Sequence, residues 1–249
     1  MNFLDRVLEF IFLPSCGVCG KLGEGYLCKK CGKVLEKYCL VEKEAGLDVE
    51  DDIKNADDKG NYELEFDNNY VEKNVKKHKS VENETVKQMH VFKYENIIRK
   101  LILQYKFNDK SYLYKTFCEF MVKNKKVFDF IKSYDIIIPV PMHRIKLRKR
   151  GYNQSELVAR ELAKKLNLKI YTDVLIKIKN NKVQSTLTKE ERKENIKNVF
   201  KVVNTDKIKG MKILILDDIY TTGATVNECI EELMCAKPEE IGVLTLAKD

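Results

Sequence analysis

The run Ile213–Thr225, ILILDDIYTTGAT, constrains the fold of this 249-residue chain more than any other feature. It begins with unbroken apolar residues, as in a strand that is buried on both faces of a parallel sheet. Two adjacent acids follow, and then a Thr- and Gly-rich turn that opens a helix. Backbone N–H groups at the start of a helix bind phosphate, and Gly allows the backbone to approach it closely. The run therefore predicts a strand, a phosphate-binding turn and a helix.

Strand and helix patterns alternate in the chain from His90 onward. Apolar residues recur at helical spacing from Val91 to Tyr105 and from Ser155 to Leu166. Apolar runs between them predict strands over 135–140, 170–178, 211–216 and 241–247. This alternation predicts an α/β domain with a parallel sheet covered by helices on both faces. Ligands of such sheets bind at the carboxyl ends of the strands.

At all thirteen positions, Ile213–Thr225 resembles the signature of type I phosphoribosyltransferases that binds 5-phosphoribosyl-1-pyrophosphate (PRPP). A helix N-cap after an acidic strand end, the alternative interpretation, accounts for one Asp and one Thr only. The resemblance implies the type I phosphoribosyltransferase fold, with Asp217 and Asp218 as catalytic acids that orient the ribose or hold hydrated Mg2+. The PRPP-binding residues that it implies are Asp217, Asp218, Thr221, Thr222, Gly223, Ala224 and Thr225.

A second segment, Ile136–Ala163, contains P-V-P-x-H and then R-G-Y-N-Q, which is similar to a hallmark of the ComF family. Five bases precede Gly151 in what we expect to be a loop between a strand and a helix. Arg binds pyrophosphate better than Lys because its donors are bidentate. The resemblance implies a pyrophosphate loop formed by Arg144, Arg148, Arg150 and Gly151. A solvated face and a nucleic-acid patch are the alternatives, and His143 could order the loop or act in catalysis.

A third segment, Gln184–Phe200, resembles the ComF pattern of Gln, Leu, Arg, Asn and Phe at matching spacing. The resemblance implies a hood loop over the substrate, with Gln184 and Arg192 as its site residues. Where the family commonly has two Arg and a Thr upstream of this Gln, the chain has Lys177, Lys179 and Asn181. The stretch YENIIRKLILQYKF, which ends at Phe107, is similar to the opening segment of the family domain.

Four of the eight cysteines form two C-x-x-C pairs: Cys16, Cys19, Cys28 and Cys31. Four thiolates suit tetrahedral Zn2+, which would be structural because all four positions are filled. So short a module lacks a core of its own, so that the metal would contribute much of its folding energy. A redox pair and an iron–sulfur cluster are the alternatives. The ComF family carries such a zinc module, which agrees with the first interpretation.

These features predict three parts: a helix plus a four-cysteine, zinc-ribbon-like module over 1–40, an acidic insertion or linker over 41–86, and a phosphoribosyltransferase-like domain over 87–249. The formal charge is +8, but residues 42–67 carry −8, so the others carry +16. Such a surplus attracts phosphates of nucleotides or nucleic acids. A generally Lys-rich proteome would also account for it.

No stretch approaches the ~20 apolar residues of a membrane span, and we interpret Met1–Pro14 as an amphipathic helix. Scattered thiols fit a reducing cytosol, so we expect a cytoplasmic protein. Two functions stay open. One is transfer of ribosyl 5-phosphate from Mg-PRPP to an unidentified nitrogen acceptor. The other, implied by the ComF resemblance, is binding of single-stranded DNA during DNA uptake and natural transformation, with uptake proteins such as a helicase as partners.

Overall fold

The computed structural model describes residues 13–41, 86–107, 110–179 and 198–249. The chain divides into two compact units. One comprises Met1–Ala45 and Val86–Asp249, and all elements given below belong to it. The second, Gly46–Thr85, lies outside the described residues, as do most of the predicted acidic insertion and of the N-terminal helix.

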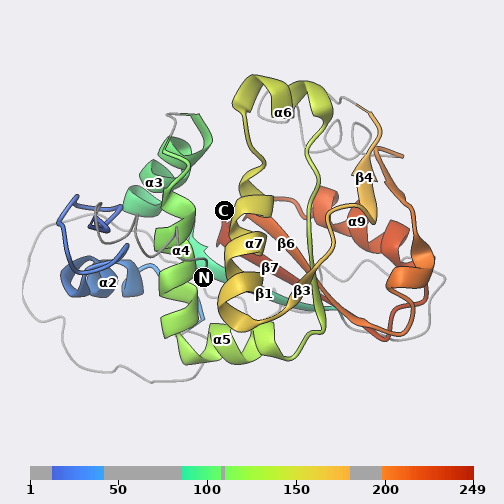
Figure 1. The fold of residues 1–249 in the computed structure, drawn as a ribbon, viewed down its shortest axis with the longest axis horizontal. Helices are drawn as coiled ribbons and strands as arrows, with labels where there is room; N and C mark the ends of the chain where they lie inside the picture. Colours follow the sequence, from blue (N-terminus) through green and yellow to red (C-terminus); the bar gives the residue numbers. More distant parts are fainter. Residues whose placement is uncertain (1–12, 42–85, 108–109, 180–197) are drawn as a thin grey trace, which may run out of the picture. The chain divides into compact units, whose positions relative to one another are not determined.

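A parallel five-stranded sheet forms the centre of the first unit (Figure 1). Its strands are β1 (Lys87–Lys93), β2 (Ile136–Pro139), β3 (Lys169–Ile170), β6 (Lys212–Tyr220) and β7 (Glu240–Lys248). They lie in the order β1-β7-β6-β2-β3, and every neighbouring pair is parallel. The parallel sheet predicted from the apolar runs is confirmed, with β6 and β2 adjacent near its middle.

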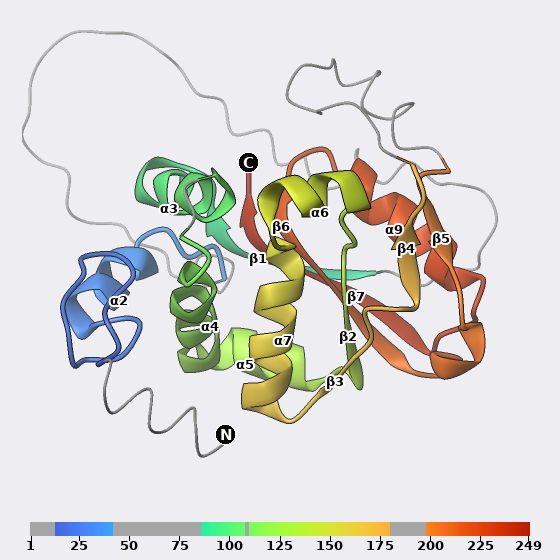
Figure 2. The same cartoon turned by 45° about the horizontal axis from the view of Figure 1, so that its top comes forward.

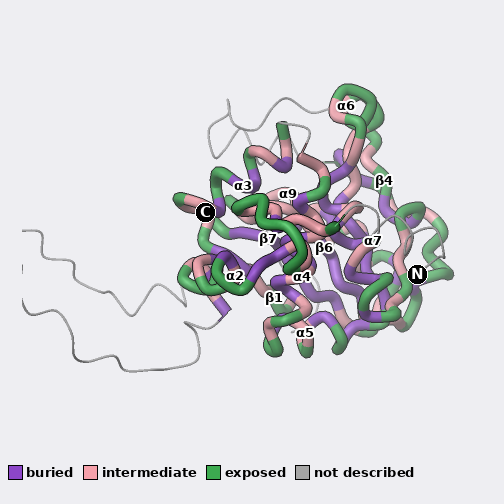
Figure 3. Tube along the Cα trace, turned by 60° about the vertical axis from the view of Figure 1, so that its left-hand side comes forward, coloured by how far each residue is buried: buried purple, intermediate pink, exposed green. Residues whose placement is uncertain are grey.

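The helices cover both faces of this sheet. One face packs against α3 (Asn96–Phe107), α4 (Leu113–Lys123), α5 (Lys125–Lys132) and α7 (Gln154–Leu166). The other packs against α9 (Ala224–Met234) and a two-stranded antiparallel sheet of β4 (Leu175–Lys177) and β5 (Phe200–Val202), followed by a 3-10 turn over Thr205–Lys207. Figure 3 shows β7 buried along most of its length between these layers, whereas β6 is buried over residues 213–216.

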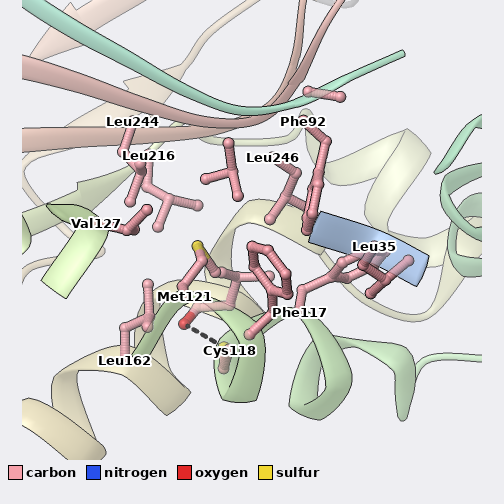
Figure 4. Close-up of a cluster of buried hydrophobic side chains, with 14 of the residues drawn as sticks. Leu35, Phe92, Phe117, Cys118, Met121, Val127, Leu162, Leu216, Leu244 and Leu246 are labelled. Carbon is pink, nitrogen blue, oxygen red and sulfur yellow. Dashed lines mark hydrogen bonds between the residues drawn. The ribbon is translucent and has the colours of Figure 1, made fainter. Parts of the chain in front are cut away.

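Alternate residues of β6 supply the two cores. Leu214 and Leu216 face the α4 and α7 side, where Phe117 and Met121 lie (Figure 4). Ile213 and Ile215 belong to the core on the α9 side. All four strand residues are at most 1% exposed. Because both faces are buried over 213–216, this part of the strand is apolar at every position, which is the pattern that identified it.

Three predictions of local structure are wrong. The helix expected from Val91 begins only at Asn96, because Val91 lies in strand β1. The single strand expected over 170–178 is two short strands, β3 and β4, that belong to different sheets. The basic segment expected to be a loop is a helix, α6 (Arg144–Arg150), which follows the end of β2 (Figure 2). His143 Nδ1 accepts a hydrogen bond from the Ile145 N–H, and Gly151, at φ 84°, ends the helix in the left-handed conformation. His143 therefore has a capping role.

The segment that carries the four cysteines runs into helix α2 (Lys29–Glu36). It packs directly on α4. Glu119 Oε2 accepts hydrogen bonds from the N–H groups of Tyr26 (2.8 Å) and Leu27 (3.1 Å). The Thr116 hydroxyl donates to the Tyr26 carbonyl at 2.9 Å. Leu27 and Leu35 belong to the same core cluster as α4. The apolar residues of this short segment are therefore buried in the core of the large domain, because the segment is too short to form a core of its own.

Candidate functional site

A cavity of about 430 Å³ lies where β6 leads into α9. Its walls come from the end of β6, the first turn of α9, α6 with the start of α7, the end of α3, and β4. It lies beyond the carboxyl ends of the adjacent strands β2 and β6, the place where parallel sheets bind ligands.

The two acids of β6 lie side by side in this cavity. Asp217 Oδ1 accepts hydrogen bonds from the Ser155 hydroxyl (3.1 Å) and from the Asp218 N–H (2.9 Å). Asp218 Oδ2 forms an ion pair with Lys106 Nζ at 2.9 Å. Burial and the neighbouring Asp218 charge raise the pKa of Asp217 to about 7, against the opposing effects of the Asp218 N–H, Lys106 and Ser155. The pair thus holds one carboxylate that is paired with a cation and one that takes up a proton near neutral pH.

The turn after β6 faces the same cavity and leads into α9. Thr222 Oγ1 lies 3.5 Å from the N–H of Ala224. Gly223 is the N-cap of α9 at φ 73°, and a Cβ there would lie 2.8 Å from Tyr220 Cζ. The Tyr220 ring in turn packs on His90, with ring centroids 4.6 Å apart. Only glycine fits this turn without strain, and the first N–H groups of α9 border the cavity.

The seven predicted PRPP-binding residues all line this one cavity: Asp217, Asp218, Thr221, Thr222, Gly223, Ala224 and Thr225. Of the predicted pyrophosphate loop, Arg150 lines it as well. Arg144 lines a neighbouring cavity of about 480 Å³, Arg148 is exposed on α6, and Gly151 caps that helix. Gln184 and Arg192, predicted for the hood loop, lie outside the described residues.

Several cavity residues were not predicted as site residues: Lys106, Lys146, Gln154, Ser155 and Lys177. Arg150 and Gln154 are joined by a hydrogen bond of 2.7 Å from Nη1 to Oε1. The R-G-Y-N-Q motif could have indicated Gln154, its last residue, and Ser155, which follows it where α7 starts. Lys177 stands where the family commonly has Arg, and Lys106 lies in the stretch similar to the family's opening segment. Neither signal places these lysines in the cavity, because separate elements, α3 and β4, bring them there.

The four cysteines of the C-x-x-C pairs converge in a second candidate site. Their Sγ atoms all lie within 4.8 Å of one another, and Cys19 Sγ lies 3.7 Å from Cys28 Sγ. A tetrahedron with metal–sulfur bonds of about 2.3 Å has edges of about 3.8 Å. Backbone N–H groups of Cys28, Cys19 and Val18 outweigh burial and lower the pKa of Cys16 to about 7, which favours the thiolate. The cluster is compatible with a bound metal ion.

A larger cavity, about 590 Å³, lies between α2 and α4. Its lining includes five lysines: Lys29, Lys33, Lys123, Lys125 and Lys126. It has neither an acid pair nor a helix-opening turn of the kind that β6 leads into. Volume alone therefore does not identify the functional site, and the chemistry of the lining favours the smaller cavity.

The fold and this cavity define a protein of the phosphoribosyltransferase class. The family model of the phosphoribosyl transferase domain matches residues 153–249, which include the acid pair and the turn. Among solved structures, Trypanosoma cruzi hypoxanthine phosphoribosyl transferase covers 55% of this chain and 65% of its own, at 14% identity and TM-score 0.36. Thermoanaerobacter pseudethanolicus adenine phosphoribosyltransferase covers 52% and 84%, at 17% identity and TM-score 0.30. Scores this low add nothing to the argument.

Sequence relatives place the chain more narrowly. Competence protein F of Haemophilus influenzae is 30% identical over 59% of this chain and 66% of its own length. DNA utilization protein YhgH of Escherichia coli O6:H1 is 32% identical over 40% and 43%, and competence protein ComFC of Bacillus subtilis is 28% identical over 55% and 53%. The chain therefore belongs to the ComF family. It spans less than two thirds of the length of each of these relatives.

Within the described residues, the structure has no helix that is both long and apolar enough to cross a membrane.

Proposed function

We propose that this protein binds PRPP in the cavity at the end of β6. One observation carries the proposal: the acid pair, the α9 turn and a basic wall face a single cavity of about 430 Å³. PRPP has a phosphate at one end, a pyrophosphate at the other and ribose hydroxyls between them. A cavity with acids between two anion-binding regions matches that order of groups.

The turn binds the 5-phosphate in this proposal. Thr221, Thr222 and Thr225 supply hydroxyl donors, and the N-terminus of α9 supplies backbone N–H groups and a partial positive charge. The first turn of α9 contains no acid that would oppose the phosphate. Asp217 and Asp218 accept hydrogen bonds from the ribose hydroxyls.

Mg2+ fits the donor set at the acid pair. It prefers carboxylate oxygens and keeps several waters. Ser155 donates to Asp217 Oδ1, and Lys106 pairs with Asp218 Oδ2. Within the described residues, the remaining oxygens, Asp217 Oδ2 and Asp218 Oδ1, have no hydrogen-bond or ion-pair partner. When bound, Mg2+ would supply charge neutralisation for the diphosphate. The Lys106 ammonium already neutralises one of the acids without it.

Bound in this way, PRPP is oriented for transfer. The bond between ribose C1 and the pyrophosphate oxygen breaks, the oxygen keeps the electron pair, and C1 bonds to a nitrogen of the acceptor. The acceptor nitrogen releases its proton to the Asp217 carboxylate, whose pKa of about 7 suits proton uptake at neutral pH. The chain's own contribution is orientation and charge neutralisation of the leaving group.

The metal at the four cysteines is Zn2+ in this proposal, and its role is structural. The thiolate set is complete, which leaves no position for a substrate.

We also propose the division into 1–40, 41–86 and 87–249, with a cytoplasmic location. The cysteine module anchors the chain to α4 through Glu119.

A second candidate function is binding of single-stranded DNA for DNA uptake, with uptake proteins such as a helicase as partners. The names of the relatives, competence protein F and DNA utilization protein YhgH, favour it. The five lysines around the cavity between α2 and α4 give a surface for backbone phosphates. Binding to a strand should weaken steeply with salt, whereas binding to a compact Mg-PRPP site should weaken less.

A calorimetric titration of PRPP with Mg2+ tests the first function. We expect saturable binding to the wild type and none to Asp217→Asn/Asp218→Asn. Asp129→Asn is the matched control, because Asp129 is an exposed surface acid paired with Lys125. Circular dichroism checks that all three proteins are folded. If the folded wild type binds no PRPP but binds an oligothymidine in a salt-dependent manner, the second function replaces the first.

A further inference from the structure

A cation from the protein itself lies at the acid pair. Lys106 Nζ is 2.9 Å from Asp218 Oδ2, and the two side chains are only 17% and 18% exposed. Among the described residues, Lys106 is the only one that forms an ion pair with either acid. Because solvent reaches the pair only in part, water and salt screen these charges less than they do at the surface. Lys106 therefore cancels the charge of one of the two carboxylates.

The packing of α3 fixes where this cation lies. Lys106 is in the last turn of the helix, directly after Tyr105, which is fully buried. The Tyr105 hydroxyl donates to the Gln154 carbonyl at 2.8 Å, and the Tyr152 hydroxyl donates to the Tyr105 carbonyl. The helix dipole also favours a cation at the carboxyl end of a helix. These contacts between α3 and the start of α7 hold the Lys106 backbone beside the end of β6.

A lysine and a divalent metal ion compete for the same acids. Mg2+ binds one or two carboxylates in such sites and keeps several waters. Asp217 Oδ2 and Asp218 Oδ1 are open to it, but the Lys106 ammonium lies on the other oxygen of Asp218. A single and a double positive charge about 5 Å apart repel by enough to weaken metal binding about tenfold, even at the dielectric constant of water. The ligand-free cavity should therefore bind Mg2+ weakly.

We propose that Lys106 is the resident cation of the acid pair: it takes the place of a divalent metal ion there. The cavity then binds a ribose phosphate without metal and takes up Mg2+ only together with the diphosphate of PRPP, whose oxygens add to the ligands of the metal. The inference rests on the proposed function for the identity of the ligand. Lys106 is a positioning residue in this role, because it holds the Asp218 carboxylate in place while the acids contact the ribose.

The first test uses the metal alone, added to the ligand-free full chain. Mn2+ is the probe, because it takes the same oxygen ligands as Mg2+ and its free concentration is measured by electron paramagnetic resonance. We expect Lys106→Met to bind Mn2+ about tenfold more tightly than the wild type, and Lys106→Arg to bind it as weakly as the wild type. The gain should be absent from Lys106→Met/Asp218→Asn. Lys100→Met is the matched control, because Lys100 is exposed on the same helix.

The second test compares ligand binding with and without Mg2+ by calorimetry. Ribose 5-phosphate should bind the wild type with an affinity that Mg2+ changes by less than about threefold, whereas PRPP should lose about tenfold or more without the metal. In Lys106→Met, ribose 5-phosphate binding should become dependent on Mg2+ by about tenfold, because the metal then replaces the missing charge. Lys106→Arg should restore the wild-type pattern. A merely structural role for Lys106 would lower the affinities with and without Mg2+ equally.

The wild-type measurements decide the matter even if Lys106→Met does not fold. The inference is wrong if the wild type binds ribose 5-phosphate only with Mg2+ or not at all, or if folded Lys106→Met binds Mn2+ no more tightly than the wild type. Binding of PRPP with Mg2+ to the wild type in that case leaves the proposed function standing. Metal-independent binding of ribose 5-phosphate that requires Lys106, without any binding of PRPP, instead retains the inference and refutes the proposed function.

Discussion

The ion pair between Lys106 and Asp218 gives a prediction that can be worked from the structure. The pair is 2.9 Å long, and its side chains are only 17% and 18% exposed. Removing one partner of a well-buried pair costs about 3–5 kcal/mol, because a charge is left buried without compensation. Some solvent reaches this pair, so we expect Lys106→Met to lower the free energy of unfolding by about 2–3 kcal/mol.

A double-mutant cycle isolates the pair from other effects of the substitution. Asp218→Asn removes the charge that Lys106 balances, so the added cost of Lys106→Met in that background should fall to about 1 kcal/mol. Urea unfolding at pH 7.5, followed by circular dichroism, measures all four proteins. Lys100→Met is the control, because Lys100 is exposed on the same helix. If the two single costs simply add, or if Lys106→Met costs less than about 0.5 kcal/mol, the pair does not stabilise the site as described.

Three further outcomes follow from the structure. Cys31→Ser should lower the bound zinc, measured by elemental analysis, from about one ion per chain to nearly none, and should reduce the thermal unfolding temperature. Gly223→Ala should weaken PRPP binding by about tenfold in calorimetry, because the left-handed conformation costs Ala about 1–2 kcal/mol and its Cβ would lie 2.8 Å from Tyr220 Cζ. The native state retains the Asp217 proton up to a pKa of about 7, so between pH 4 and 7 this group makes stability fall with rising pH. Asp217→Asn should therefore become more stable relative to the wild type across that range in urea unfolding, by up to about 1.4 kcal/mol per pH unit, and a constant difference would contradict the raised pKa.

The part of the site that could be predicted from the sequence is the part that is continuous along it. The strand end, the acids, the threonines and Gly223 follow one another in a single run of the sequence. The residue type at each of these positions indicates its chemical role by itself. Both faces of β6 are buried, so its apolar run is unbroken and its identity as a strand could be inferred. The four-cysteine cluster could also be predicted from the sequence, because its two C-x-x-C pairs lie close together along the chain.

The rest depends on long-range packing. Lys106 reaches Asp218 from a helix more than a hundred residues earlier, and Lys177 reaches the cavity from a strand of the second sheet. The sequence contains no sign that the strand expected over 170–178 divides between two sheets. The helix α6 could have been predicted from the sequence, because Arg, Lys and Leu favour helix and Gly151 lies where it can end the helix. Attention to charge alone led to the wrong prediction of a loop.

A crystal structure of the full chain grown with Mg2+ and PRPP tests the central claim most directly. The account predicts the 5-phosphate against the N–H groups of 223–225, the ribose beside Asp217 and Asp218, and the pyrophosphate at the basic wall of the cavity. PRPP bound in the reverse direction, or bound in the lysine-lined cavity between α2 and α4, would contradict it.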